Sequence, residues 1–194
     1  MGYTPASDAG RRDERREELT MADEALTSTD FPIMLMQMSF ARMKQAIEGL
    51  SDEQLSFQPD PASNSIGWLV WHLSRWKDIQ TARVADEAEV WITDGWAGRF
   101  GLPEERNGNG DTPEQVAAFR AERGLLEGYA EAAHDAALRR MREATPEQLK
   151  RTVSSPGRPD RPAYRSLLIN AIDYTEHTGQ IAYLRGMLTG PGWM

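Results

Sequence analysis

The residues of this sequence that could do chemistry are a few histidines and carboxylates. There are three histidines and no cysteine, so strong metal ligands must be imidazoles or carboxylates. Asp173 and His177 stand four residues apart in a stretch with helical periodicity, which places their Cβ atoms on one face, roughly 6 Å apart. Gln180 continues that stripe, and His72 lies in another apolar stretch. If the two helices pack together, two imidazoles and a carboxylate form a set that suits zinc, nickel or iron.

A purely structural interpretation of the same residues is also open. Each histidine could be a hydrogen-bonded core residue, and Asp173 could pair with an arginine such as Arg75 or Arg165, because a buried carboxylate needs a partner. His134 is interpreted as structural or exposed, with a place in the lining of a pocket as the alternative. Asp78 is interpreted as a solvated or paired helix residue, with support of a metal ligand as the alternative.

Other kinds of catalytic site find little support in the sequence. It contains no phosphate-binding glycine loop, no nucleophile elbow and no His-Glu-x-x-His pair. Glu131 and Glu176 could serve as acid or base, but no motif singles them out.

Four long helices must position the candidate residues. Apolar residues that recur every three or four positions predict helices at about 31–50, 63–84, 112–144 and 164–189. Capping boxes begin at Ser51, Thr112 and Thr145. Irregular, glycine- and proline-rich links are expected at 86–110 and 152–163. This order predicts an all-α four-helix bundle, whose long crossover links favour a topology other than up-down-up-down.

Two segments outside the long helices carry separate predictions. The 86–110 link contains Trp91, Trp96 and Phe100 and ends in a glycine- and asparagine-rich run, so it could either cover a pocket or seal one end of the core. Residues 1–27 are polar and charged, which predicts a flexible leader before a single domain at 28–194.

Charge and hydropathy limit the partners. Thirty acidic against 22 basic residues give a net charge of -8, which disfavours binding to nucleic acid. No stretch reaches the roughly 20 apolar residues of a membrane helix, and the N-terminus lacks a signal peptide's order of basic and apolar residues. We therefore expect no membrane association and a cytoplasmic location.

Three segments carry a resemblance to a known family. The run from Asn64 to Leu73, NSIGWLVWHL, resembles the second-helix signature of the DinB superfamily, and HTGQIAYLRG from His177 resembles its closing motif. The segment from Val90 to Pro103 is similar to the intervening loop of one branch. The resemblance implies a DinB/YfiT-like four-helix bundle, commonly homodimeric, with His72, Asp173 and His177 as metal ligands.

The resemblance also implies an activity. Related proteins, including the mycothiol-dependent maleylpyruvate isomerase, use a divalent metal and a low-molecular-weight thiol. The expectation is a metal-dependent S-transferase that acts on small electrophiles, with zinc or nickel favoured and iron as a further candidate. A metal-dependent hydrolase and a non-enzymatic metal- or ligand-binding stress-response protein are the alternatives. Asp173 departs from the family, in which His or Glu is usual at that position.

Overall fold

The computed structural model describes residues 27, 29–155 and 158–190. The leader predicted at residues 1–27 therefore lies, apart from Thr27, outside the described residues. The elements are α2 (Asp30–Ile47), α3 (Asp52–Leu55), α4 (Ile66–Ala85), α5 (Val90–Thr93), α6 (Trp96–Phe100), α7 (Pro113–Ala118), α8 (Arg123–Glu143), α9 (Pro146–Lys150), β1 (Thr152–Ser155), β2 (Arg158–Pro162) and α10 (Ala163–Thr189).

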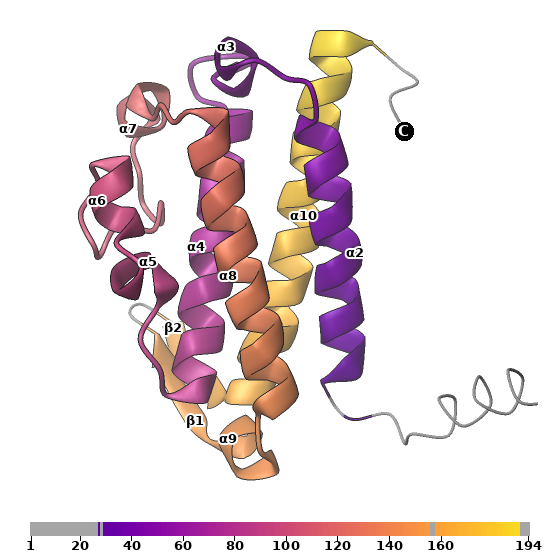
Figure 1. Cartoon of the computed structure of the whole chain (residues 1–194), viewed down its shortest axis with the longest axis vertical. Coiled ribbons are helices and arrows are strands. Elements are labelled where there is room, and N and C mark those ends of the chain that lie inside the picture. Colours follow the sequence, from indigo (N-terminus) through magenta and orange to yellow (C-terminus); the bar gives the residue numbers. More distant parts are fainter. Residues whose placement is uncertain (1–26, 28, 156–157, 191–194) are drawn as a thin grey trace, which may run out of the picture.

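The four long helices form a bundle in which neighbours in sequence are not always antiparallel. Helices α2 and α10 run in one direction, and α4 and α8 run in the other (Figure 1). The parallel pairing of α2 with α10 follows from two contacts, between the Ser39 and Thr175 hydroxyls at 2.9 Å and from Arg185 Nη1 to the Ala46 carbonyl at 3.0 Å. Because α4 and α8 are also parallel, the link between them must cross back along the bundle. The expected crossover topology is confirmed.

The predicted helix over 112–144 is wrong as one continuous element. It is two helices, because α7 ends at Ala118 and α8 begins only at Arg123. Phe119 turns its ring into the core, where its centroid lies 5.1 Å from that of Trp71. The Arg123 N–H then donates to Asp52 Oδ1 at 2.8 Å. Burial of an aromatic ring and a side-chain cap at the new N-terminus both favour the break.

The link at 152–163 also differs from the irregular segment that was expected. Strands β1 and β2 pair antiparallel, with Thr152 opposite Pro162 and Val153 opposite Arg161. Only Val153 of β1 is a buried hydrophobic residue, so the hairpin lacks the apolar alternation that reveals most strands. Its position at the start of α10 brings Arg161 to the side of the bundle.

The first half of the 86–110 link closes the core. Trp91, Trp96 and Ala97 are buried, and Phe100 packs against the same hydrophobic cluster. A buried carboxylate anchors the start of this link, since Asp78 Oδ1 and Oδ2 accept hydrogen bonds from the backbone N–H groups of Val90 and Trp91 at 3.1 and 2.9 Å. These donors begin α5, so Asp78 satisfies the free N–H groups of that helix.

Asp78 is also the centre of a buried ion-pair network. Its Oδ1 lies 2.9 Å from Arg140 Nη1, and the Tyr129 hydroxyl donates to Oδ2 at 3.3 Å. Arg75 contacts Asp78 at 3.8 Å and forms a closer pair with Glu89 at 2.8 Å. The interpretation of Asp78 as a paired helix residue is confirmed, and its role is to hold the crossover link against the bundle.

A second buried polar cluster lies where all four long helices meet. Lys77 is completely buried, with its Nζ 3.3 Å from His134 Nδ1 and 3.4 Å from the Tyr174 hydroxyl, and 4.7 Å from the centroid of Phe40. Burial lowers the pKa of Lys77 well below its usual 10.5. His134 stacks on Phe40 at 3.9 Å, and burial lowers its pKa to about 3. The structural interpretation of His134 is confirmed.

Lys77→Met is expected to stabilise the protein at pH 7. Burying a polar group such as this amine costs about 1–3 kcal/mol, which an apolar side chain of similar length avoids, and the lost hydrogen bonds offset about 1 kcal/mol. Because the folded-state pKa of Lys77 is depressed, the unfolded chain binds more protons up to pH 10.5, and the free energy of unfolding rises with pH over that window. Urea unfolding from pH 7 to 10 should show this rise in the wild type and a smaller slope in Lys77→Met. Equal slopes would contradict a lowered pKa of Lys77 in the folded protein.

Candidate functional site

His72 is held in one orientation on α4. Its ring stacks on Trp68 with centroids 4.4 Å apart, and its Nδ1 donates to the Asn107 carbonyl at 2.7 Å. A carbonyl can only accept, so the proton is on Nδ1 and Nε2 keeps a free lone pair. Burial lowers the pKa of His72 from 6.5 to about 4. At neutral pH this imidazole is uncharged and able to bind a metal.

His177 on α10 is arranged in the same way. Its Nδ1 donates to the side-chain oxygen of Gln180 at 3.0 Å, which again leaves Nε2 as the free nitrogen. That nitrogen lies 3.7 Å from Asp173 Oδ1. Gln180 therefore orients the imidazole of His177, which explains why it belongs to the polar stripe with Asp173 and His177.

The imidazoles of His72 on α4 and His177 on α10 meet edge to face. Their ring centroids are 5.3 Å apart, close to the separation of about 5 Å expected for two imidazoles on one tetrahedral ion with metal–nitrogen distances of about 2.1 Å. Asp173 would add a carboxylate. In the described part of the chain no three His, Asp or Glu side chains are already arranged as a ligand set, so the trio stays a prediction. The chemistry of its donors fits a divalent metal.

The end of the crossover link lies directly on His72. Gly108 has φ of 84°, and a Cβ there would stand 2.5 Å from His72 Nδ1 and 2.8 Å from Trp68. Asp111 fastens this segment by accepting hydrogen bonds from Trp68 Nε1 and Arg106 Nη2, each at 2.9 Å. The link therefore both seals the core, through its aromatic residues, and covers the candidate site, through its last residues.

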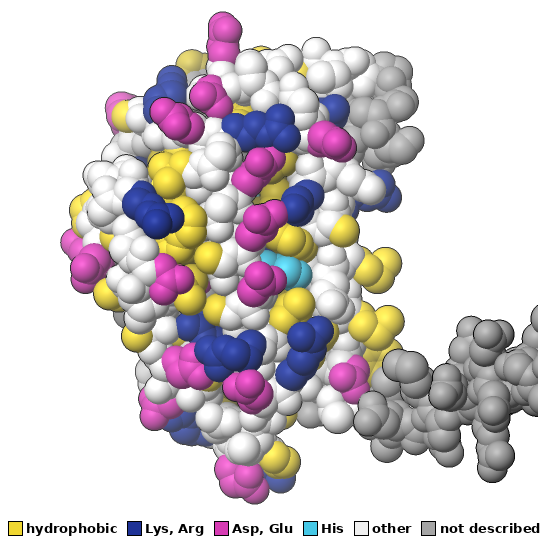
Figure 2. All heavy atoms as spheres, in the orientation of Figure 1, with side chains coloured by type: hydrophobic (Ala, Val, Ile, Leu, Met, Phe, Trp, Pro, Cys, Tyr) yellow, Lys and Arg dark blue, Asp and Glu magenta, His cyan; other side chains and the backbone are white. Residues whose placement is uncertain are grey.

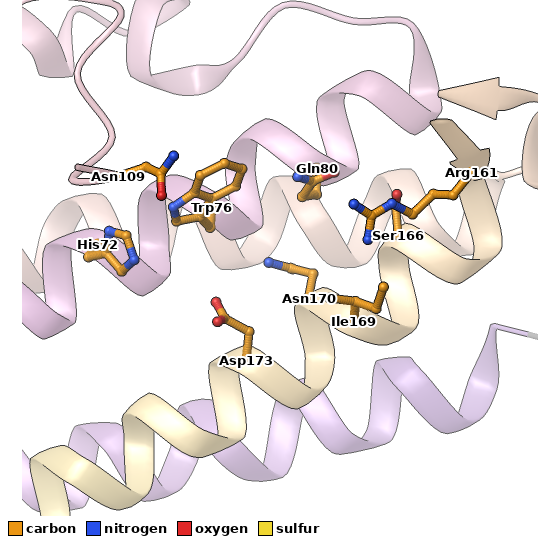
Figure 3. Close-up of a pocket in the computed structure, with 9 residues that line it drawn as sticks. All are labelled: His72, Trp76, Gln80, Asn109, Arg161, Ser166, Ile169, Asn170 and Asp173. Carbon is orange, nitrogen blue, oxygen red and sulfur yellow. The ribbon is translucent and has the colours of Figure 1, made fainter. Parts of the chain in front are cut away.

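A small cavity opens beside the imidazoles. It is lined from α4 by His72, Trp76 and Gln80, from the crossover link by Asn109, from β2 by Arg161 and from α10 by Ser166, Ile169, Asn170 and Asp173. Figure 3 shows His72 and Asp173 toward one end of this cavity and Arg161 with Ser166 toward the other. The cavity joins two of the three predicted ligands to a polar surface that a substrate could occupy.

The remaining candidates lie elsewhere. Arg75, one suggested partner of Asp173, forms ion pairs with Glu89 and Asp78 instead. Arg165, the other suggested partner, is exposed on the first turn of α10. His134 does not line the cavity, whereas Trp76 does. Glu131 forms an ion pair with Lys44 on the surface.

Several pocket residues were missed from the sequence. Ser166 and Asn170 extend the polar stripe of α10 backward from Asp173 at spacings of four and three residues, so helical periodicity was a signal that could have found them. Gln80 likewise lies eight residues, about two turns, after His72 on α4. Arg161 had no such signal, because its position depends on a hairpin that the sequence pattern does not reveal.

Fold and site together define an all-α four-helix bundle with a long crossover link and a polar cavity between α4 and α10. A family model described as the DinB superfamily matches residues 36–181. The chain belongs to the DinB superfamily, and the resemblance noted in its helix motifs is confirmed.

A solved structure has the same fold. The crystal structure of the conserved protein of locus from Enterococcus faecalis superposes with a TM-score of 0.77 at 24% identity, covering 86% of this chain and 99% of that chain. No curated protein matches this chain. At this identity the similarity establishes the fold alone.

The surface carries charges of both signs. On the face shown in Figure 2, acidic and basic side chains are interspersed, and hydrophobic side chains gather along the edge formed by α2. Phe31, Met34 and Met38 are among the exposed large hydrophobic residues of that helix. Within the described ranges, no helix combines the length and apolar character needed to cross a membrane.

Proposed function

We propose that the protein binds one divalent metal ion through His72, Asp173 and His177 and uses it in the S-transfer of a low-molecular-weight thiol to a small electrophile. One observation carries the metal site. Both imidazoles donate their Nδ1–H to an oxygen, from Asn107 and Gln180 respectively, so both Nε2 atoms are free to bind. Such fixed tautomers are typical of metal-ligating histidines.

The chain's own residues would set up the reaction. Burial keeps His72 in its neutral, ligating form, and Trp68 with the Asn107 carbonyl fixes its ring. When bound, a zinc or nickel ion, or iron, would supply a positive charge that favours the thiolate over the thiol. In S-transfer the thiol loses its proton, a carbon–sulfur bond forms at the electrophilic carbon, and the leaving group departs with the bonding electrons.

Metal content tests the site. Protein purified without chelators is expected to contain about one divalent metal per chain by mass spectrometry, because three protein ligands suffice for a catalytic-type site. His72→Ala and His177→Ala should each lose it. His134→Gln is the matched control, since His134 is the third histidine of the chain and lies outside the cavity. The proposal is wrong if the wild type contains no stoichiometric metal. It is also wrong if His134→Gln loses as much metal as His72→Ala and His177→Ala.

Turnover separates an enzyme from a binder. We expect the metal-loaded protein to accelerate loss of thiol with monochlorobimane for at least one member of a broad panel of low-molecular-weight thiols. Ester and amide hydrolysis measured in parallel tests the metal-dependent hydrolase. Metal binding without turnover in either assay would instead support a metal- or ligand-binding stress-response protein.

A homodimer is part of the same proposal. Exposed hydrophobic residues on α2, namely Phe31, Met34 and Met38, and on α10, including Leu168 and Ile172, offer apolar area of the kind that an interface covers. The two helices that carry these residues pack side by side and run parallel.

A further inference from the structure

The end of the cavity that is remote from His72 is lined by polar side chains without partners. Gln80, Arg161, Ser166 and Asn170 line the cavity, and none of them forms a side-chain hydrogen bond or ion pair with another described residue. They come from three separate elements, α4, β2 and α10. This polar surface extends beyond the predicted metal ligands, so metal binding does not explain it.

Asn170 is the clearest of the four. It is only 4% exposed, and its Oδ1 is buried without a hydrogen-bond partner, as is Oε1 of Gln80. Buried amides are normally satisfied, since leaving one without a partner is costly. Figure 3 shows the Asn170 amide directed into the space between Trp76 and Asp173. The nitrogen of this amide leads into the cavity, so Asn170 can donate a hydrogen bond to an oxygen atom of a ligand there.

Arg161 gives the sign of the charge that this ligand carries. Other arginines near the bundle core are neutralised, Arg75 by Glu89 at 2.8 Å and Arg140 by Asp78 at 2.9 Å. Arg161 has no such acidic partner among the described residues, although the chain has eight more acidic than basic residues. A guanidinium left without an acid in an acidic protein, beside a hydroxyl and two amides, matches the acceptor geometry of a carboxylate.

We propose that Arg161, Ser166 and Asn170 form a subsite for the carboxylate group of a small-molecule substrate. The Asp173 carboxylate toward the opposite end of the cavity repels a second negative charge, so the substrate binds with its carboxylate at Arg161 and its other end toward His72. That this other end is the electrophilic carbon rests on the proposed function. The carboxylate subsite itself stands on the cavity alone.

Size and charge narrow the substrate class. The cavity has a volume of about 70 Å³, which is enough for a few water molecules. A short-chain carboxylic acid fits this space. A single guanidinium matches a monoanion better than a phosphate dianion, which usually recruits several cations. The substrate is therefore expected to be a short carboxylate with an electrophilic carbon a few bonds from the carboxyl group.

Binding of crotonate and propionate tests the subsite, with crotonamide and propionamide as neutral isosteres. Ligand-observed NMR with the full chain, with and without added zinc, should show binding of the acids at least tenfold tighter than that of the amides. Arg161→Met should remove this preference, and Arg161→Lys should retain part of it. Arg165→Met is the matched control, because Arg165 is exposed on the adjacent turn and its loss changes the net charge equally.

The outcomes distinguish this inference from the proposed function. Equal binding of acids and amides, or equal losses in Arg161→Met and Arg165→Met, would overturn the carboxylate subsite even if the protein holds its metal. Conversely, Arg161-dependent binding of carboxylates by a protein that holds no metal would uphold the subsite while the metal proposal fails. Circular dichroism of each variant confirms that the fold is retained, and a metal content unchanged in Arg161→Met separates the subsite from the metal ligands.

Discussion

Asp78→Ala is expected to lower the free energy of unfolding by about 3–5 kcal/mol, the usual cost of removing one member of a buried ion pair. The side chain is fully buried, and its loss leaves the Arg140 guanidinium, 2% exposed, with the partly exposed Glu87 carboxylate, 3.1 Å from Nε, as its remaining acidic partner. It also removes the acceptors of the Val90 and Trp91 N–H groups. Urea unfolding followed by circular dichroism measures the loss.

A matched control and a double variant make the prediction specific. Glu105→Ala removes the same charge from an exposed position in the same crossover link and should change stability by no more than about 0.5 kcal/mol. Because Asp78 and Arg140 form a direct ion pair, Asp78→Ala combined with Arg140→Met should cost less than the sum of the single variants. A small effect of Asp78→Ala, or strict additivity, would contradict the network.

Gly108→Ala is expected to disturb both stability and the candidate metal site. At φ of 84° an alanine is strained by about 1–2 kcal/mol, and its Cβ would meet His72 Nδ1 at 2.5 Å and Trp68 at 2.8 Å. Relief of these contacts must move the loop or the imidazole, which adds about 1–3 kcal/mol. Loss of the Asn107 hydrogen bond to His72 should weaken metal binding by about 10- to 100-fold.

Gly110→Ala provides the matched control for backbone strain. Gly110 has nearly the same φ, 81°, but a Cβ there would meet no atom within 4 Å. The difference in unfolding free energy between the two variants therefore isolates the contact with His72 and Trp68. Competition titration with a chromogenic chelator compares their zinc affinities. Equal stability and equal affinity in the two variants would show that the close approach of Gly108 does not orient His72.

The sequence predicts the positions of the long helices better than the structure of the links between them. Helical periodicity located α2, α4 and α10 to within about three residues at each end, because each buries a continuous stripe of apolar side chains. The same reasoning failed at Phe119, where an apolar residue in a helical pattern packs into the core from an extended backbone. It failed again at the hairpin, whose strands, TVSS and RPDRP, lack apolar alternation.

Part of the candidate site could also be predicted from the sequence, and part could not. The spacing of Asp173, His177 and Gln180 on one helix follows from the sequence, since a helix brings residues three and four apart onto one face. That His72 stands 5.3 Å from His177 is decided by the antiparallel packing of α4 on α10. The family motifs anticipated this meeting, but the fixed tautomers depend on a carbonyl from Asn107, 35 residues from His72.

The sequence by itself determined a cysteine-free, acidic, helical protein with three histidines, each on a different predicted long helix. These are local properties, because composition and the period of a helix do not depend on distant contacts. Only the tertiary structure shows that Asp78 holds the crossover link, that Gly108 lies in close contact with His72 and that Arg161 lines the cavity. Each of these depends on segments far apart in sequence, whose meeting is set by packing of the whole bundle.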